Sequence, residues 1–245
     1  MSRVTANGQM IRARTSIHEQ SRPYELRVMR RVAPGQPKLS KVIAALSETT
    51  GNFVNYKKDP RRLGVTLMML GPLMRHLLGT GPGQRVTAED LRTAEEDLNR
   101  RVAHAKYQDY NVPLFDPMFQ PLDLYGHKKQ YLGIRLSPKD LRLTGDRAIV
   151  ESYFRGKFRL SENDLDRHLE DLDPHITIGR VLYGNMDEEQ IAALQDNPST
   201  FLLQADRARQ ERLVEFEGRP AVVPIVFPEA IGLNGLRIVC QPKGS

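Results

Sequence analysis

His175 and Thr177 stand two residues apart in a segment, residues 174–180, that is rich in β-branched and aliphatic side chains. Such a composition favours a strand, in which side chains two positions apart point to the same face. An imidazole exchanges protons near neutral pH, and a threonine hydroxyl can hold a phosphoryl oxygen. The pair is therefore a candidate for half of a phosphoester-cleaving site. The alternative is an ordinary polar pair at a sheet edge.

A second segment upstream, residues 63–70, has the same rhythm. Thr66 stands in it as Thr177 stands in the later segment, but Gly64 occupies the position that corresponds to His175. Glycine can neither give nor take a proton. The second segment therefore repeats the pattern of the first, without its histidine.

Several other residues near these segments could contact an anionic ligand. Strict alternation places Arg180 on the opposite face from His175 unless the strand bends, so Arg180 is a secondary candidate for a phosphate contact. Tyr131 and Tyr183 could stack on a base, although aromatic residues in strands more often pack in the core. Arg61 and Arg62 are candidates for electrostatic attraction.

The composition is that of an ordinary globular protein, with 245 residues, 40% hydrophobic and 27% charged. No apolar run approaches the roughly 20 residues that span a bilayer, so we expect no membrane segment. Cys240 is the only cysteine, which excludes an internal disulfide and a cysteine metal cluster. These features predict a cytoplasmic protein.

The net charge of +6 is unevenly distributed. Residues 1–62 contain 13 Lys and Arg against 4 Asp and Glu, a surplus of 9, whereas the remainder has 23 against 26. Arginine suits bidentate contact with phosphate, so the basic third predicts an anionic ligand. A solvated basic surface is the alternative.

The hydrophobic pattern predicts a mixture of strands and helices. Residues 1–22 are polar and basic without periodicity, which indicates a flexible arm, and residues 23–242 are expected to form one domain. Expected strands cover residues 24–29, 65–70, 114–125, 130–136, 176–183, 222–227 and 236–240, and expected helices cover residues 39–50, 88–105, 187–194 and 201–216. Residues 148–154 fit either element, and Asn234-Gly235 is a strong turn signal.

Hairpin-like pairs recur without regular strand–helix alternation. This order predicts an α+β fold with a mostly antiparallel sheet rather than a doubly wound parallel sheet.

The Pro-His-Ile-Thr-Ile-Gly-Arg segment at 174–180 resembles the second signature of the two-histidine phosphoesterase superfamily, which includes the RNA 2′,3′-cyclic phosphodiesterases or 2′-5′ RNA ligases. The order of the expected elements is also similar, over about residues 24–240. The resemblance implies a bilobal, pseudo-symmetric domain of antiparallel sheets flanked by helices. It also implies an RNA or nucleotide phosphate ligand, with no metal and no cofactor.

In this family each of two His-x-Thr/Ser elements supplies a histidine for proton transfer and a hydroxyl for the phosphate. The resemblance implies these roles for His175, Thr177 and Thr66, and it makes Gly64 a departure from the pattern. The other histidines lack a Ser or Thr two residues later and are expected at the surface; they are His18, His76, His104, His127 and His168.

Three interpretations follow from the departure at Gly64. The chain is an active phosphoesterase in which His175 works alone or with a replacement for the lost partner. Alternatively it is an inactive module that binds RNA ends or nucleotides through Thr66 and Thr177. In the third interpretation the segment is an ordinary strand, and the fold serves protein contacts. Sequence leaves these three open, together with the substrate and the oligomeric state.

Overall fold

A computed structural model describes residues 24–57, 59, 62–69, 88–105, 109–126, 128–158 and 173–242. The expected N-terminal arm, residues 1–22, lies outside the described residues, as do residues 70–87 and 159–172.

One antiparallel sheet organises the described part of the chain. Its eight strands run in the order β4-β8-β1-β3-β7-β6-β5, and β2 also pairs with β7. The strands are β1 (Tyr24–Val32), β2 (Val54–Tyr56), β3 (Gly64–Met69), β4 (Tyr110–Pro113), β5 (Leu122–Tyr125), β6 (Tyr131–Arg135), β7 (His175–Val181) and β8 (Ala230–Pro242). All the strand pairs are antiparallel, so the α+β prediction is confirmed.

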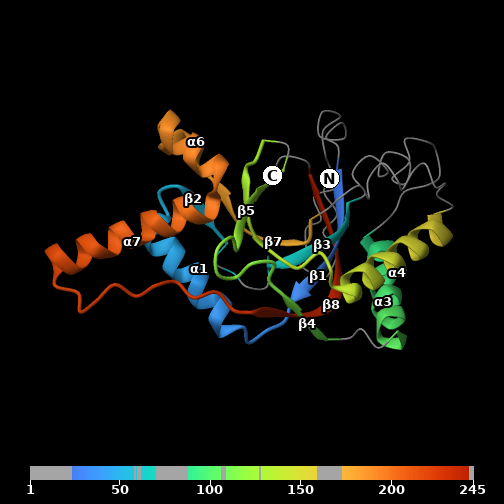
Figure 1. Cartoon of the computed structure of the whole chain (residues 1–245). Coiled ribbons are helices and arrows are strands. Elements are labelled where there is room, and N and C mark those ends of the chain that lie inside the picture. Colours follow the sequence, from blue (N-terminus) through green and yellow to red (C-terminus); the bar gives the residue numbers. More distant parts are fainter. Residues whose placement is uncertain are drawn as a thin grey trace, which may run out of the picture.

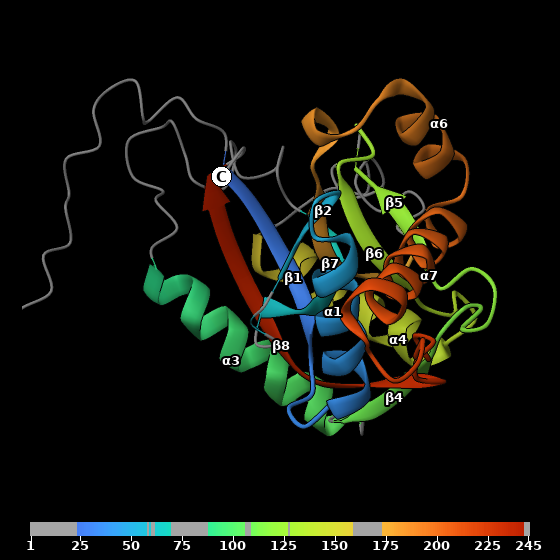
Figure 2. The ribbon, with the colours of Figure 1, turned by 90° about the vertical axis from the view of Figure 1, so that its left-hand side faces the viewer.

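Helices lie on both sides of this sheet (Figure 1). α1, α6 and α7 lie on one side and α3 and α4 on the other, while Figure 2 shows α3 running beside β8. The helices are α1 (Pro37–Thr50), α3 (Ala88–His104), α4 (Leu141–Phe158), α6 (Glu188–Asp196) and α7 (Pro198–Glu217), with a short 3-10 helix η2 (Tyr183–Asn185). Residues 148–154, which the pattern left undecided, are helical within α4.

Local sequence signals explain several helix boundaries. The Asp187 side chain accepts a hydrogen bond from the Gln190 amide, and the Gln190 side chain accepts one from the Asp187 amide, which forms a capping box at the start of α6. Asn197 caps the start of α7 by accepting a hydrogen bond from the Thr200 amide, and Gly218, in the left-handed conformation, caps its end. These helices therefore begin and end where short-range hydrogen bonding favours it.

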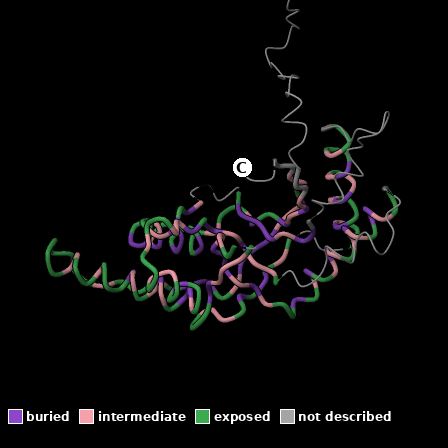
Figure 3. Tube along the Cα trace, turned by 90° about the horizontal axis from the view of Figure 1, so that it is seen from above, coloured by how far each residue is buried: buried purple, intermediate pink, exposed green. Residues whose placement is uncertain are grey.

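The buried residues gather along the strands and along the helix faces that cover them (Figure 3). In the central strands Val65 is 1% exposed, and Ile176, Ile178 and Ile134 are 0% exposed. The far end of α7 is exposed, with Phe216 76% accessible. Burial on one face of each strand leaves the other face available for polar residues.

Two expectations about the C-terminal third are wrong. Residues 222–227 form no strand, and Asn234-Gly235 makes no turn, because both residues lie inside the continuous strand β8. The register between β1 and β8 shifts between Arg30 and Arg31, where Arg30 pairs with Leu236 and Arg31 with Asn234. Gly235 is thus the extra residue of a β-bulge, so the glycine serves a bulge and not a hairpin.

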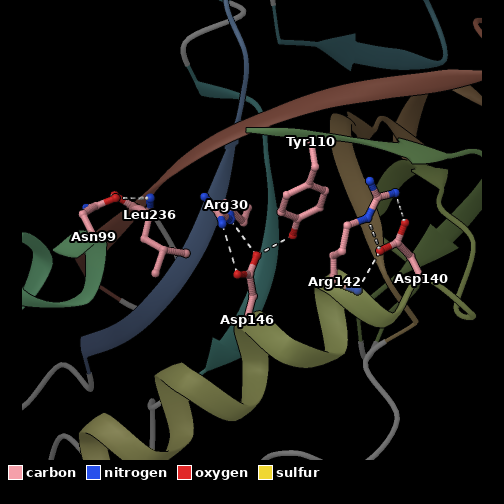
Figure 4. Close-up of polar contacts among 7 residues, drawn as sticks. All are labelled: Arg30, Asn99, Tyr110, Asp140, Arg142, Asp146 and Leu236. Carbon is pink, nitrogen blue, oxygen red and sulfur yellow. Dashed lines mark hydrogen bonds and ion pairs between the residues drawn. The ribbon is translucent and has the colours of Figure 1, made fainter. Parts of the chain in front are cut away.

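A buried ion pair joins β1 to α4 (Figure 4). Arg30 Nε and Nη2 donate to the two Asp146 carboxylate oxygens at 2.6 and 3.0 Å, and both side chains are fully buried. The Tyr110 hydroxyl donates to the same carboxylate, and burial followed by this hydrogen bond raises the pKa of Tyr110. The triad ties α4 to the sheet.

Side chains of α3 bind the backbone groups of β8 that no described strand pairs with. Asn99 accepts a hydrogen bond from the Leu236 amide at 2.7 Å and donates to the Leu236 carbonyl at 3.0 Å (Figure 4). Glu95 accepts from the Ile238 amide at 2.7 Å. A covered edge cannot recruit another strand.

No helix in the described ranges is long and apolar enough to cross a membrane. Because strands from Tyr24 to Pro242 belong to one sheet, we retain residues 23–242 as the proposed single domain.

Candidate functional site

A β-bulge in β7 decides which of its side chains share a face. Thr177 pairs with Gly133 of β6 and Gly179 with Leu132, so Ile178 is the extra residue. Ile178 and Gly179 are accordingly both buried, whereas His175 and Thr177 are partly exposed and Arg180 is exposed. After the bulge the alternation is reversed. Arg180 therefore lies on the same face as His175, and the expectation of an opposite face is wrong.

β3 brings Thr66 beside this face of β7. Val65 faces Ile176 in an antiparallel pair, and both side chains point into the core. Extending this antiparallel pairing by one residue in each direction places Thr66 opposite His175 and Gly64 opposite Thr177. Residues directly opposite each other across strands have Cβ atoms about 5 Å apart. Thr66, His175 and Thr177, predicted from segments more than 100 residues apart, thus lie on one surface.

Neither threonine hydroxyl makes a hydrogen bond with any described residue. Both side chains are partly exposed. Two hydroxyls on one polar surface, each with its hydrogen-bonding capacity open, are suited to hold the oxygens of a bound anion.

Gly64 has a packing reason for lacking a side chain. A Cβ atom at this position would lie 2.5 Å from the Arg30 carbonyl oxygen and 3.2 Å from the Met29 methyl carbon. The first contact is with the main chain of β1, which is held in the sheet and cannot move aside cheaply. A histidine at position 64 would therefore require a shift of the β1 backbone.

We expect Gly64→His to lower the free energy of unfolding by about 1–3 kcal/mol, the typical effect of overpacking, and to leave any phosphoesterase activity unimproved. Denaturant unfolding and a turnover assay would measure both effects. Gly184→His is the matched control, because nothing lies within 4 Å of a Cβ at Gly184. A gain of activity in Gly64→His at unchanged stability would contradict the packing argument.

The ring of His175 is held in one orientation. Its Nδ1 lies 2.7 Å from the Asp173 carbonyl oxygen. A carbonyl oxygen only accepts, so Nδ1 carries the hydrogen and a neutral ring has its lone pair on Nε2. His175 is thereby prepared to accept a proton at Nε2.

Tyr125 of β5 covers one face of the His175 ring. The two ring centroids are 3.4 Å apart and the planes differ by 9°. Gly133 lies beneath both rings, since a Cβ there would be 2.8 Å from Tyr125 and 3.0 Å from His175. Sequence reasoning did not identify Tyr125 or Gly133. The available signal was Gly133 in the middle of an apolar strand, which often marks a close approach.

Burial and positive charge act together on the titratable groups of this face. Burial is the largest influence on His175 and lowers its pKa, and the charges of Arg27 and Lys57 lower it further, against the opposing effect of Asp173. Burial, followed by the charges of Arg27 and Arg62, lowers the pKa of Lys57 to about 8. His175 is thus mostly neutral at pH 7, within a cationic environment that attracts anions.

Other candidates from sequence have different outcomes. Tyr131 pairs with Arg180 and is half-buried, whereas the Tyr183 hydroxyl donates to the Lys129 carbonyl at 2.7 Å. Arg62 is exposed and acts on Lys57. Of the remaining histidines His104 is exposed on α3, and the other four, together with Arg61, lie outside the described residues.

Two cavities in the described part of the chain do not contain His175. One, of about 570 Å³, lies between α1 and residues 219–226. The other, of about 380 Å³, is lined by α1 side chains, Leu63 and Lys57. We therefore take the β3–β7 face, and neither cavity, as the candidate functional site, because His175 and the threonine hydroxyls gather there.

No protein-family model matches the chain, and no curated protein matches it. Solved structures with a similar fold include Usb1 of Kluyveromyces marxianus, with 14% identity, a TM-score of 0.46, and coverage of 91% of this chain and 99% of the other. TT0787 of Thermus thermophilus has 13% identity, a TM-score of 0.46, and coverage of 88% and 87%. E. coli LigT, solved with ATP, has 13% identity, a TM-score of 0.39, and coverage of 90% and 88%.

These structural neighbours are members of the two-histidine phosphoesterase superfamily, the family that the 174–180 segment resembles. At such identities, and with TM-scores below 0.5, the likeness carries no argument about what this chain does. The roles of Thr66, His175 and Thr177 depend on the geometry of the β3–β7 face.

Proposed function

We propose that the chain is a phosphoesterase that acts on RNA ends or on 2′,3′-cyclic or 2′-5′-linked nucleotides. The observation that carries the proposal is the common face of β3 and β7. On it a histidine with its Nε2 lone pair available lies beside two threonine hydroxyls that make no hydrogen bond with described residues. Proton transfer and phosphate binding are the two requirements of phosphoester cleavage.

Each residue has a distinct role in this proposal. His175 Nε2 takes the proton from the attacking oxygen, and the hydrogen bond to the Asp173 carbonyl stabilises the imidazolium that results. Thr66 and Thr177 hold the non-bridging phosphate oxygens. Arg180, which the bulge places on the same face, is proposed as an additional phosphate contact. The resemblance implies a reaction without metal or cofactor.

Gly64 favours a second candidate function. Without a histidine on β3, the same face could bind RNA ends or nucleotides through Thr66 and Thr177 without cleaving them. The phosphate-binding half of the site is the same in both proposals. The two functions therefore differ only in whether proton transfer occurs.

Turnover distinguishes the two functions. We would assay hydrolysis of 2′,3′-cyclic nucleotides and of a short 2′-5′-linked oligonucleotide in the presence of EDTA, and measure saturable binding of the same compounds. We expect EDTA-resistant turnover. Binding without turnover would replace the enzyme by the binding module, and absence of both would reject the β3–β7 face as a phosphate site.

We expect Thr66→Val and Thr177→Val each to weaken binding of a nucleotide phosphate roughly tenfold or more, since a hydrogen bond to a charged group is worth about 1.5–3 kcal/mol. The valine keeps the β-branched shape that a strand favours, so the fold is preserved. Titration with nucleotide at several salt concentrations would measure the loss. Thr200→Val on the exposed part of α7 is the control, and equal binding by all three variants would contradict the role of the hydroxyls.

The single cysteine fits a reducing compartment, and we retain the cytoplasm as the proposed location.

A further inference from the structure

Two strands, β2 and β3, pair with the same edge of β7 one after the other, and Lys57 lies between them. β2 pairs with the end of β7 through Val54, Asn55 and Tyr56, while β3 pairs with its beginning through Val65 and Ile176. The Lys57 amide donates to the Ile178 carbonyl at 2.7 Å. Ile176 and Ile178 are two residues apart, or about 7 Å along a strand. Lys57 is therefore next to the segment that begins at Gly64.

The burial pattern of β2 gives the side on which Lys57 lies. Val54 and Tyr56 are buried in the core, whereas Asn55 is exposed and pairs with Arg180. Arg180 shares its face with His175, so Asn55 does too. By alternation the position of Lys57, the residue after Tyr56 at the end of β2, faces this same side, and its side chain also borders the cavity against α1 and Leu63. A lysine has a flexible four-carbon stem that spans the distance to a neighbouring strand position.

The electrostatics of the site agree with this placement. Lys57 and Arg27 are the two positive charges that lower the pKa of His175, so the charged end of Lys57 acts on the His175 ring. The charged groups around the pair come from every adjoining element: Arg27 on β1, Arg62 before β3, Asp173 before β7, Arg180 on β7, Arg135 on β6, which pairs with His175, and Glu48 on α1, which lines one cavity with Lys57.

We propose that Lys57 is the second proton-transfer group of this site, the general acid that protonates the leaving oxygen, in place of a histidine at position 64. The inference rests on the proposed phosphoesterase function. It names the partner of His175 that the first strand segment lacks. The site then needs no histidine at position 64, because the residue that follows β2 supplies the general acid.

The proton balance can be followed for a 2′,3′-cyclic nucleotide. His175 Nε2 takes one proton from water as the water oxygen forms a bond to phosphorus. The bond between phosphorus and one ribose oxygen breaks, and the Lys57 ammonium gives that oxygen a proton. The products are a phosphomonoester and a free hydroxyl. A proton then passes from the His175 imidazolium to the Lys57 amine through solvent, which restores both groups.

The two protonation states that the step requires coexist near neutral pH. His175 must be neutral and its pKa is below the ordinary value of 6.5, while Lys57 must be charged and its pKa is about 8. An ordinary lysine, at 10.5, would be a much weaker acid at this pH. We therefore expect a bell-shaped dependence of kcat/KM on pH, with the alkaline limb near pH 8.

Leaving-group dependence tests the assignment. Lys57→Met should lower kcat for a 2′,3′-cyclic nucleotide by about 10²-fold or more, the usual contribution of a positioned acid. It should leave a nitrophenyl phosphodiester nearly unaffected, because nitrophenolate departs without a proton. The alkaline limb should disappear in Lys57→Met and move to higher pH in Lys57→Arg. Lys41→Met, an exposed lysine on α1, is the matched control.

The outcomes separate the inference from the function on which it rests. Equal losses on both substrates would make Lys57 a phosphate ligand, and an unchanged pH profile in Lys57→Met would remove it from the site. Either result would overturn the inference while the natural protein still turned over and His175→Ala did not. Absence of turnover by the natural protein would instead overturn the phosphoesterase proposal and the inference with it.

Discussion

His175→Ala should lower kcat/KM for 2′,3′-cyclic nucleotides by about 10²–10⁴-fold, the contribution of a positioned general base. The loss follows from the geometry of the ring. Its Nδ1 hydrogen is committed to the Asp173 carbonyl, so Nε2 is the atom that takes the proton, and alanine offers no substitute. Turnover at substrate saturation and at low substrate would show whether kcat falls, as a proton-transfer role requires.

The pH profile provides a second measurement of the same role. Burial, Arg27 and Lys57 lower the pKa of His175, so its neutral, reactive form persists to lower pH than that of an ordinary histidine. The midpoint of the acid limb of kcat/KM in the natural protein should therefore lie below 6.5, the ordinary pKa of a histidine, as the ring takes a proton. In His175→Ala this acid limb should be absent from any residual activity.

His104→Ala is the control for His175→Ala, since His104 is exposed on α3 and lies apart from the β3–β7 face. It should retain full turnover. Unaltered turnover in His175→Ala would remove the histidine from the reaction.

Asp146→Ala should lower the free energy of unfolding by about 3–5 kcal/mol, because it leaves the fully buried Arg30 without its carboxylate partner. Tyr110 loses its hydrogen-bond acceptor in the same variant. For a chain of this size the change corresponds to a fall in Tm of roughly 6–20 °C. Thermal and denaturant unfolding would measure it.

Two controls show how much of this loss of stability comes from burying Arg30 without the Asp146 carboxylate, and how much an ordinary ion pair contributes. The double variant Arg30→Met/Asp146→Leu removes both charges, and we expect it to be more stable than Asp146→Ala. Glu211→Ala breaks an exposed pair with Arg207 on α7 and should change stability by less than about 1 kcal/mol. A double variant as unstable as Asp146→Ala would show that packing, and not the loss of the carboxylate partner, causes the loss of stability.

Local signals in the sequence determined the parts of the fold that depend on near neighbours. The helical spacing of apolar residues in 88–105 and in 187–194 predicted α3 and α6, because a helix is built from contacts within four residues. The placement of His175 and Thr177 on one face follows from the two-residue period of a strand, and it was predicted correctly.

Features that depend on strand pairing were beyond the reach of these signals. The bulge at Ile178 reverses the alternation and brings Arg180 to the His175 face, and the bulge at Gly235 turns an apparent hairpin signal into a continuous strand. A bulge exists only relative to a partner strand, so the sequence of one strand does not reveal it.

The sequence by itself therefore determined the antiparallel α+β class, the His175 and Thr177 pair, and the absence of a histidine at position 64. Only the tertiary structure placed Tyr125 on the His175 ring and Lys57 beside the strand that begins at Gly64. These two residues come from other segments, 50 and 118 positions away from His175 in the chain. Their proximity depends on the order and register of the strands, which local residue patterns do not specify.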